Sequence, residues 1–228
     1  MPSRTLMLAC GLAALMASSA PASALSYFYF TGGTTTTLNS AFNPSNQPAD
    51  LAPGDQILSF GKNDTNLGLN FYSDTNAKIT YTFLGKEAGF TNELDSLGGT
   101  ATGKLFDTTA AAGASVTSKF GPTSGSLVPF RFKVASGGSG EADNGGPMNG
   151  GRDISIGFRP RGGFSATNNY SVVYAMFSDG GGTGDNDFDD MLVQISITHA
   201  PIPPAAVLFV GGLAGIGFLS KRRKPATI

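Results

Sequence analysis

Alternation of apolar and polar residues with a period of two most limits the folds open to this chain. In residues 79–83, Ile79, Tyr81 and Phe83 alternate with threonines. The pattern continues over residues 128–134, 154–158, 173–177 and 193–197. Because successive side chains of a β-strand point to opposite faces, it predicts strands with one buried face. No long segment has the 3.6-residue period of a helix, so we expect an all-β domain, an antiparallel sandwich or jelly roll.

Long glycine-rich loops are expected to join these strands. Residues 136–151 contain seven glycines, which predicts a long turn or a flexible loop. The threonine run at residues 34–37 predicts a loop or an edge strand, and residues 110–114 predict a helical turn at most. Pro129 favours an edge position for its strand, because proline has no N–H to donate to a neighbour.

The N-terminal residues have the three parts of a secretory signal peptide. Arg4 supplies the positive charge, residues 6–17 are apolar, and Ala22 and Ala24 form a small-residue cleavage site. We therefore expect signal peptidase to remove residues 1–24. Cys10, the only cysteine, lies in the removed segment, so the mature chain can have no disulfide and no thiolate metal site.

The C-terminal residues predict a membrane anchor. Residues 205–220 are uncharged and mostly apolar, which is close to the shortest length that spans a bilayer. A basic run follows at once, consisting of Lys221, Arg222, Arg223 and Lys224. Positive charge stays on the cytoplasmic side. We therefore expect a domain at 25–198 outside the cytoplasm, a linker at 199–204 and a cytoplasmic tail at 221–228.

This end of the chain resembles the PEP-CTERM sorting signal of exported bacterial proteins. The resemblance rests on Pro201 and Pro203, the apolar segment ending Gly-Phe-Leu and the basic run, with Ile202 at the position of the name-giving Glu. It implies an exosortase-like processing enzyme as a partner. It also implies passage from the inner membrane to the cell surface or the extracellular space.

Charge and residue types exclude several function classes. Residues 25–198 hold all 16 acidic residues and 10 of the 15 basic ones, a net charge of −6. Nucleic acid as a partner would require a basic surface. The only histidine, His199, lies in the predicted linker, which excludes a Ser-His-Asp arrangement within the domain.

The densest polar cluster is the acidic loop at residues 179–190, between two predicted strands. Calcium takes six to eight oxygen ligands, which closely spaced Asp and Asn side chains supply. Like charges this close repel one another, and a bound cation relieves the repulsion. The candidate calcium ligands are Asp185, Asp187 and Asp189, with Asp179 and Asp190 as further candidates.

Known calcium motifs fit this loop only in part. Counted from Asp185, an EF-hand requires Gly where this chain has Asp190. The nonapeptide of calcium-binding β-rolls fits with Asn186 in place of Asp, but that fold needs tandem copies and only one is present. The alternative is a capped hairpin, in which Phe188 points into the core and the acids face water.

A second resemblance involves the same loop. The sequence from Gly184 to Asp190, followed by an aliphatic strand, resembles the closing motif of a β domain of unknown function in exported bacterial surface proteins. Residues 85–92 resemble an earlier motif of the same domain. The resemblance implies an extracytoplasmic β domain without a known reaction. It leaves open whether Glu87 and Asn92 contact the acidic loop or only form a turn.

These observations predict a non-enzymatic, exported surface or matrix protein, with calcium as a candidate stabilising ligand. One alternative is a carbohydrate-binding module or adhesin that recognises exopolysaccharide. Abundant Tyr and Phe favour it, whereas the absence of tryptophan, a common sugar-stacking side chain, counts against it. The other alternative is a glycoside hydrolase, which needs a carboxylate pair that Glu87, Glu93 or Glu141 could supply.

Overall fold

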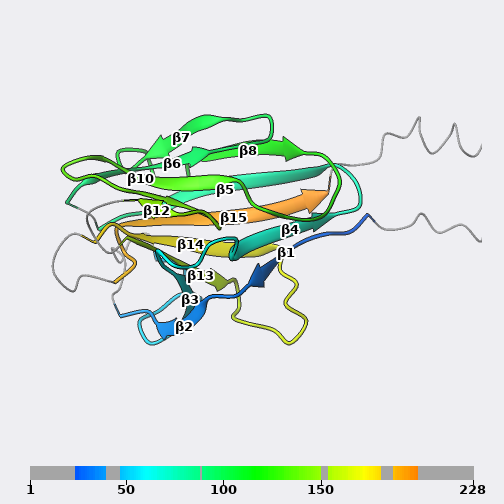
Figure 1. Ribbon diagram of the computed structural model, residues 1–228, viewed down its shortest axis with the longest axis horizontal. Coiled ribbons are helices and arrows are strands. Elements are labelled where there is room, and N and C mark those ends of the chain that lie inside the picture. Colours follow the sequence, from blue (N-terminus) through cyan, green and yellow to red (C-terminus); the bar gives the residue numbers. More distant parts are fainter. Residues whose placement is uncertain (1–23, 40–46, 88, 150–153, 181–186, 200–228) are drawn as a thin grey trace, which may run out of the picture.

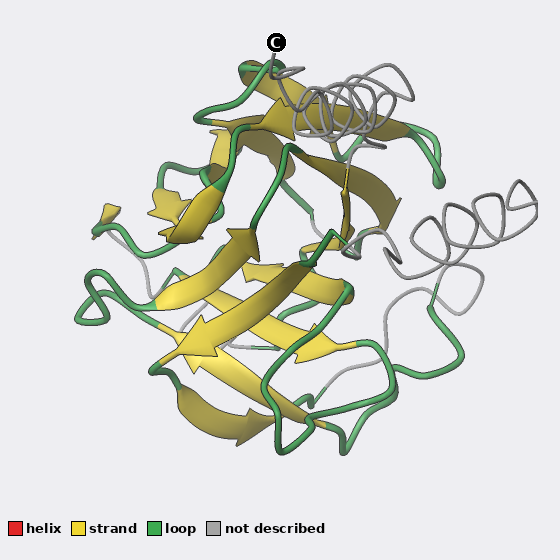
Figure 2. Cartoon of the chain, turned by 90° about the vertical axis from the view of Figure 1, so that its right-hand side faces the viewer, coloured by secondary structure: helices red, strands yellow, loops and turns green. Residues whose placement is uncertain are grey.

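The part of the chain described by the computed structural model comprises residues 24–39, 47–87, 89–149, 154–180 and 187–199. These residues form three antiparallel sheets joined by turns and loops, without a helix (Figures 1 and 2). The all-β prediction is therefore confirmed. The predicted membrane helix at 205–220 and most of the signal peptide lie outside the described residues. Within the described ranges, no helix has the length and apolar character to cross a membrane.

The largest sheet has seven strands in the order β2-β3-β13-β14-β15-β5-β8 (Figure 1). Its strands are β2 (Thr34–Thr37), β3 (Gln56–Phe60), β5 (Ala77–Gly85), β8 (Ser115–Phe120), β13 (Ser155–Pro160), β14 (Val172–Ser178) and β15 (Met191–His199). Four of the five predicted strands belong to this sheet. The threonine run is its edge strand, β2, in agreement with one of the two expectations for it.

The remaining strands form two smaller sheets. The five-stranded sheet has the order β12-β11-β10-β6-β7, and the three-stranded sheet has the order β1-β4-β9. Their bounds are β1 (Ser26–Thr31), β4 (Gly68–Ser73), β6 (Thr91–Ser96), β7 (Gly103–Asp107), β9 (Thr123–Leu127), β10 (Phe130–Ser136), β11 (Glu141–Asp143) and β12 (Met148–Asn149).

Buried aromatic side chains pack both smaller sheets against one face of the seven-stranded sheet. Phe132 of β10 stacks on Phe177 of β14 with ring centroids 5.0 Å apart. Phe30 of β1 contacts Phe158 of β13 with centroids 5.7 Å apart. Burial of one such side chain contributes about 1.5–3 kcal/mol, and a good aromatic pair adds about 1 kcal/mol.

The opposite face of the seven-stranded sheet is covered at its centre by a second apolar cluster. This cluster consists of Leu38, Leu51, Ile57, Tyr174, Met176, Phe188 and Leu192. Consequently β14 is buried on both faces, which explains why its sequence does not alternate cleanly. Gly157 gives Phe188 room, because a Cβ at this position would lie 2.9 Å from the Phe188 ring.

Three details of the sequence-based description are wrong. Pro129 does not mark an edge strand, because β10 begins after it and lies between β6 and β11. The glycine-rich segment at 136–151 includes two short strands, β11 and β12, that extend the five-stranded sheet. The expected linker also starts too early, since His199 is still paired with Ala77 in the sheet.

Asn144 joins the two smaller sheets through its side chain. Its Oδ1 accepts from the Leu69 N–H at 2.9 Å. Its Nδ2 donates to the carbonyls of Leu69 and Val128 at 2.7 and 2.8 Å. Because Asn144 is buried, water cannot readily replace its side chain as the hydrogen-bond partner of these three backbone groups. The amide therefore replaces regular strand pairing where β4 approaches the start of β10.

The Asn144→Leu substitution should lower the free energy of unfolding by roughly 3 kcal/mol, since it strands buried backbone donors and acceptors. Urea unfolding followed by far-ultraviolet circular dichroism measures this loss. The matched control is Asn149→Leu at an exposed position of β12, where a change within about 0.5 kcal/mol is expected. Equal losses in the two variants would contradict the bridging role.

Candidate metal centre

The acidic loop connects β14 to β15, which are antiparallel neighbours at the centre of the large sheet. Asp179 follows the last residue of β14, and Asp190 directly precedes β15. The two predicted strands on either side of the loop are thus antiparallel partners. Residues 181–186, including Asp185, lie outside the described residues. The described acids of the loop are Asp179, Asp187, Asp189 and Asp190.

Three of these carboxylates converge. Asp187, Asp189 and Asp190 each offer an oxygen, and the three oxygens lie within 4.8 Å of one another. Two ligands on opposite sides of a calcium ion are about 5 Å apart, given calcium–oxygen bonds of about 2.4 Å. The cluster could therefore hold a metal ion.

Phe188 gives the loop this shape. Its side chain is 1% exposed and belongs to the second apolar cluster. Its backbone has a φ of 65°, a region that large side chains rarely adopt. The gain from burying the ring offsets this strain, which is of order 1–3 kcal/mol. Phe188 is held against the sheet, and Asp187 and Asp189 on either side of it contribute their carboxylates to the acidic cluster.

A buried hydrogen-bond network connects the loop to the five-stranded sheet. The Asp179 N–H donates to Asp190 Oδ2 at 2.7 Å. Asn92 of β6 donates from Nδ2 to Asp179 Oδ2 at 2.9 Å. The Glu87 N–H donates to the Asp189 carbonyl at 2.9 Å. Two residues of the earlier motif, residues 85–92, thus contact the loop: Asn92 through its side chain and Glu87 through its backbone.

Several oxygens beside this network have no hydrogen-bond partner within the described ranges. They are Asp179 Oδ1, Asn92 Oδ1 and Asp187 Oδ1. Asp179 is 1% exposed and Asn92 is fully buried, so solvent does not readily satisfy them. An unpaired buried acceptor costs about 1–3 kcal/mol. Among the described residues no donor reaches these oxygens, and metal ions such as calcium coordinate both carboxylate and amide oxygens.

The carboxyl group of Asp190 lies in an environment that disfavours its negative charge. Burial raises the pKa of its carboxyl to about 8, and the neighbouring carboxylates of Asp179, Asp187 and Asp189 add to the increase. The Asp179 N–H opposes this shift only in part. The raised pKa favours the protonated carboxyl of Asp190, and a bound cation would compete with that proton.

The alternative in which the loop acids face water is wrong for Asp179, Asp189 and Asp190, which are buried, whereas Asp187 is half-buried. The related expectation that Phe188 points into the core is confirmed. Sequence reasoning gave Asn92 no clear part in the cluster. Its only signal was the earlier motif, since 87 residues separate Asn92 from Asp179.

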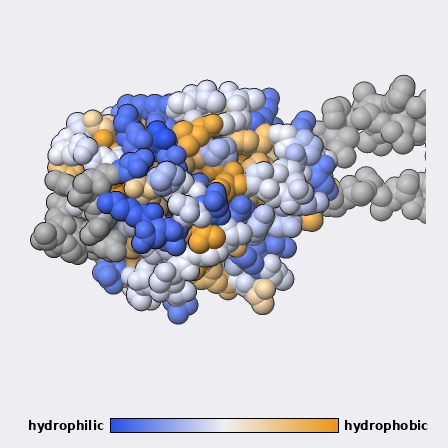
Figure 3. Space-filling model, viewed as in Figure 1, coloured by the Kyte–Doolittle hydropathy of each residue, from blue (hydrophilic) through white to orange (hydrophobic). Residues whose placement is uncertain are grey.

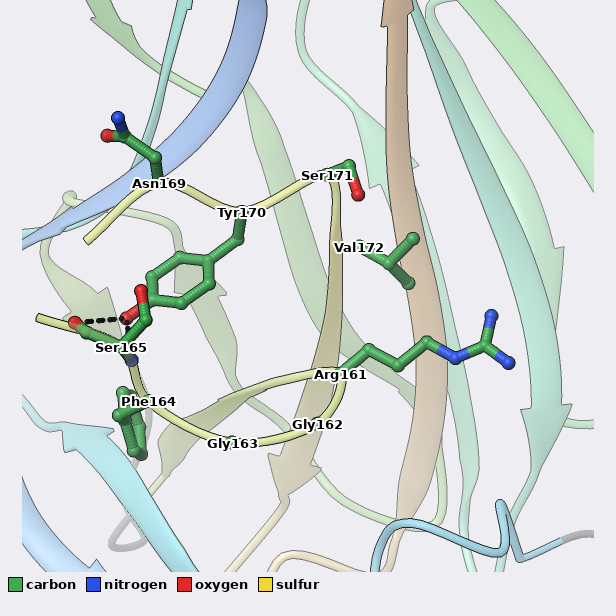
Figure 4. Close-up of a pocket in the computed structure, with 9 residues that line it drawn as sticks. All are labelled: Arg161, Gly162, Gly163, Phe164, Ser165, Asn169, Tyr170, Ser171 and Val172. Carbon is green, nitrogen blue, oxygen red and sulfur yellow. Dashed lines mark hydrogen bonds between the residues drawn. The ribbon is translucent and has the colours of Figure 1, made fainter. Parts of the chain in front are cut away.

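A separate cavity of about 470 Å³ lies in the segment that joins β13 to β14 (Figure 4). Its lining residues are Arg161, Gly162, Gly163, Phe164, Ser165, Asn169, Tyr170, Ser171 and Val172. The Tyr170 hydroxyl accepts from the Ser165 N–H at 3.0 Å, and the Arg161 side chain extends away from the Tyr170 ring. Among the described residues that line this cavity there is no carboxylate, and hence no acid–base pair.

Comparison with known proteins identifies no relative: no protein-family model, curated protein or solved structure matches the chain. The site must therefore be interpreted from its own geometry.

The stability of the calcium-free protein should depend on the ionisation of Asp190. Folding raises the pKa of Asp190 above its ordinary value of 3.8, so its protonated form stabilises the folded state. This stabilisation is complete below pH 3.8 and is lost as the pH rises through about 8. Asp190→Asn removes this titration and retains an acceptor for the Asp179 N–H. We expect the melting temperature in chelator to fall from pH 5 to pH 8.5 more steeply in the wild type than in the variant. Parallel pH profiles would contradict the assignment.

Proposed function

We propose that this protein is a non-enzymatic, exported cell-surface or matrix protein whose β domain is stabilised by calcium at the acidic loop. The observation that carries the proposal is the convergence of Asp187, Asp189 and Asp190 beside the unpaired, buried oxygen of Asp179. Asp185 is a further candidate ligand. Calcium suits this set because it takes carboxylate oxygens in flexible geometry.

Calcium at this position would connect the two layers of the fold. Asp187, Asp189 and Asp190 belong to the β14–β15 hairpin, and Asn92 reaches the same network from β6. The ion would offset the repulsion between buried carboxylates and satisfy oxygens that lack donors. Binding to the folded state alone stabilises that state by mass action. Extracellular calcium modules bind with dissociation constants of about 0.1–1 mM, which suits work outside the cell.

Export by signal peptidase fits the start of the domain. The Leu25 backbone nitrogen donates to Asp74 Oδ1 at 2.9 Å, one residue before β1 begins. Cleavage after Ala24 would turn this nitrogen into an ammonium group beside a carboxylate. We further propose inner-membrane anchoring through residues 205–220, followed by exosortase-like processing. This part of the proposal rests on the PEP-CTERM resemblance.

The finer fold assignment, a β-sandwich of jelly-roll type, is also a proposal. Its support is that the seven-stranded sheet buries one face against both smaller sheets. The hydrolase alternative gains nothing from Glu93 or Glu141. Glu93 pairs with Lys133 at 3.3 Å and Glu141 pairs with Arg131 at 3.0 Å, and both are structural ion pairs of the five-stranded sheet.

Thermal melting of the exported protein, purified in mild detergent, tests the calcium proposal. Calcium at 100 times its dissociation constant adds about 2.7 kcal/mol, which should raise the melting temperature by roughly 5–10 °C over chelator. The double variant Asp187→Asn, Asp189→Asn should lose most of this rise. Asp64→Asn is the matched control in a distant turn, where Asp64 accepts from the Gly61 N–H.

A rise that persists in the double variant would place the ion elsewhere, and no rise in the wild type would leave the loop as a capped turn. The export proposal has its own test in cell fractionation. Recovery of the protein from the cytoplasm alone would contradict it.

A further inference from the structure

The strands of the three-stranded sheet carry no charged side chain, and Asp74 lies just beyond the end of β4. Strands β1, β4 and β9 contain no Asp, Glu, Lys or Arg. The outer face of the neighbouring five-stranded sheet has the opposite character, since Arg131, Lys133 and Glu93 form ion pairs across its strands. In Figure 3 the deepest hydrophilic colour gathers over the left-hand part, where Figure 1 places β6 and β10. Two adjacent sheets of one layer therefore present different chemistry to solvent.

Tyrosines supply the outer face of the three-stranded sheet with aromatic surface. Tyr27 of β1 is directly opposite Tyr72 of β4, and their rings stack with centroids 5.1 Å apart and an interplanar angle of 18°. Tyr29 follows on the same face of β1, 6.1 Å from the Tyr27 ring. All three are half-buried, so each ring rests on the sheet and retains exposed surface.

Tyr29 lies along the sheet instead of standing upright. Its hydroxyl reaches Gly125 of β9, where a Cβ would be 2.3 Å from the hydroxyl oxygen. Because β4 separates β1 from β9 and adjacent strands are about 4.8 Å apart, the ring must cross β4 to make this contact. One face of the ring is thereby turned outward. Gly125 is the residue that makes this arrangement possible.

Polar groups without charge surround the rings. Asn70 is paired with Tyr29 across the strands and donates from Nδ2 to Thr31 Oγ1 at 2.9 Å. The face therefore combines flat aromatic surface with hydroxyl and amide groups. Pyranose rings have the matching character, with apolar C–H faces and a rim of hydroxyls.

We propose that the face formed by Tyr27, Tyr29 and Tyr72 binds a neutral polysaccharide. The absence of charge on all three strands disfavours a polyanion as the occupant. Three strands of five or six residues cover only about 15 by 20 Å, or about 300 Å². A stable protein interface needs about 800 Å² on each partner, so the area suits a narrow chain better than a second protein. The proposal is independent of calcium at the acidic loop.

Native affinity electrophoresis of the detergent-purified protein tests this proposal, with dextran, soluble starch or laminarin in the gel and alginate as the acidic counterpart. At least one neutral polymer should slow the protein. The double variant Tyr27→Ala, Tyr72→Ala should weaken that binding at least fivefold, as expected when aromatic stacking is lost. Tyr27→Phe keeps the ring and should retain binding. Leu97→Ala, at an apolar residue that is 46% exposed just after β6 of the five-stranded sheet, should have no effect.

Tyrosine fluorescence provides a second measurement on unmodified protein, because the chain has no tryptophan. Emission should change on addition of the retarding polymer. The proposal is overturned by the absence of retardation with every neutral polymer, by equal retardation of the alanine variant with an unchanged melting temperature, or by binding to alginate alone. A tyrosine-dependent dimer without polysaccharide binding would assign the face to a second copy and overturn it too.

Discussion

Burial of both faces of β14, and of the first residues of β15, is the constraint on which the rest of the structure depends. Aromatic contacts from the smaller sheets cover one face, and the cluster containing Phe188 covers the other. A hairpin between two such strands must bring its connecting loop back over apolar surface. Phe188 fixes that return, and Asp189 and Asp190 beyond it are buried with it. Carboxylates this close together repel one another, and a proton on Asp190 or a bound cation would relieve the repulsion.

The alternation in the sequence is cleanest in the strands that have one face in contact with water. Residues 79–83 and 193–197 alternate because β5 and β15 present polar side chains on one side for much of their length. Strand β1 was not predicted, because its outward residues are tyrosines, so inward and outward positions are both aromatic. The short strands β11 and β12 lie within a glycine-rich segment, where their pairing depends on β10 and leaves no periodic signal of its own.

The candidate site was visible from sequence only as a concentration of acids. That density pointed to Asp185, Asp187 and Asp189, with Asp179 and Asp190 as further candidates. Of these, the structure brings Asp187, Asp189 and Asp190 together. It could not show that Asp179 would be buried against Asn92, because this contact depends on how the two layers stack. The spacing of the acids along the chain fits an exposed turn as well as it fits a metal site. Burial, a tertiary property, separates the two possibilities.

Calcium titration by isothermal calorimetry at pH 7.5 tests the central claim most directly. The account predicts one ion bound per chain, with a measured heat that depends on the buffer, because the ion displaces a proton from Asp190. The Asp190→Asn variant should lose that buffer dependence. No binding at millimolar calcium, or binding unaffected by Asp187→Asn and Asp189→Asn, would contradict the account.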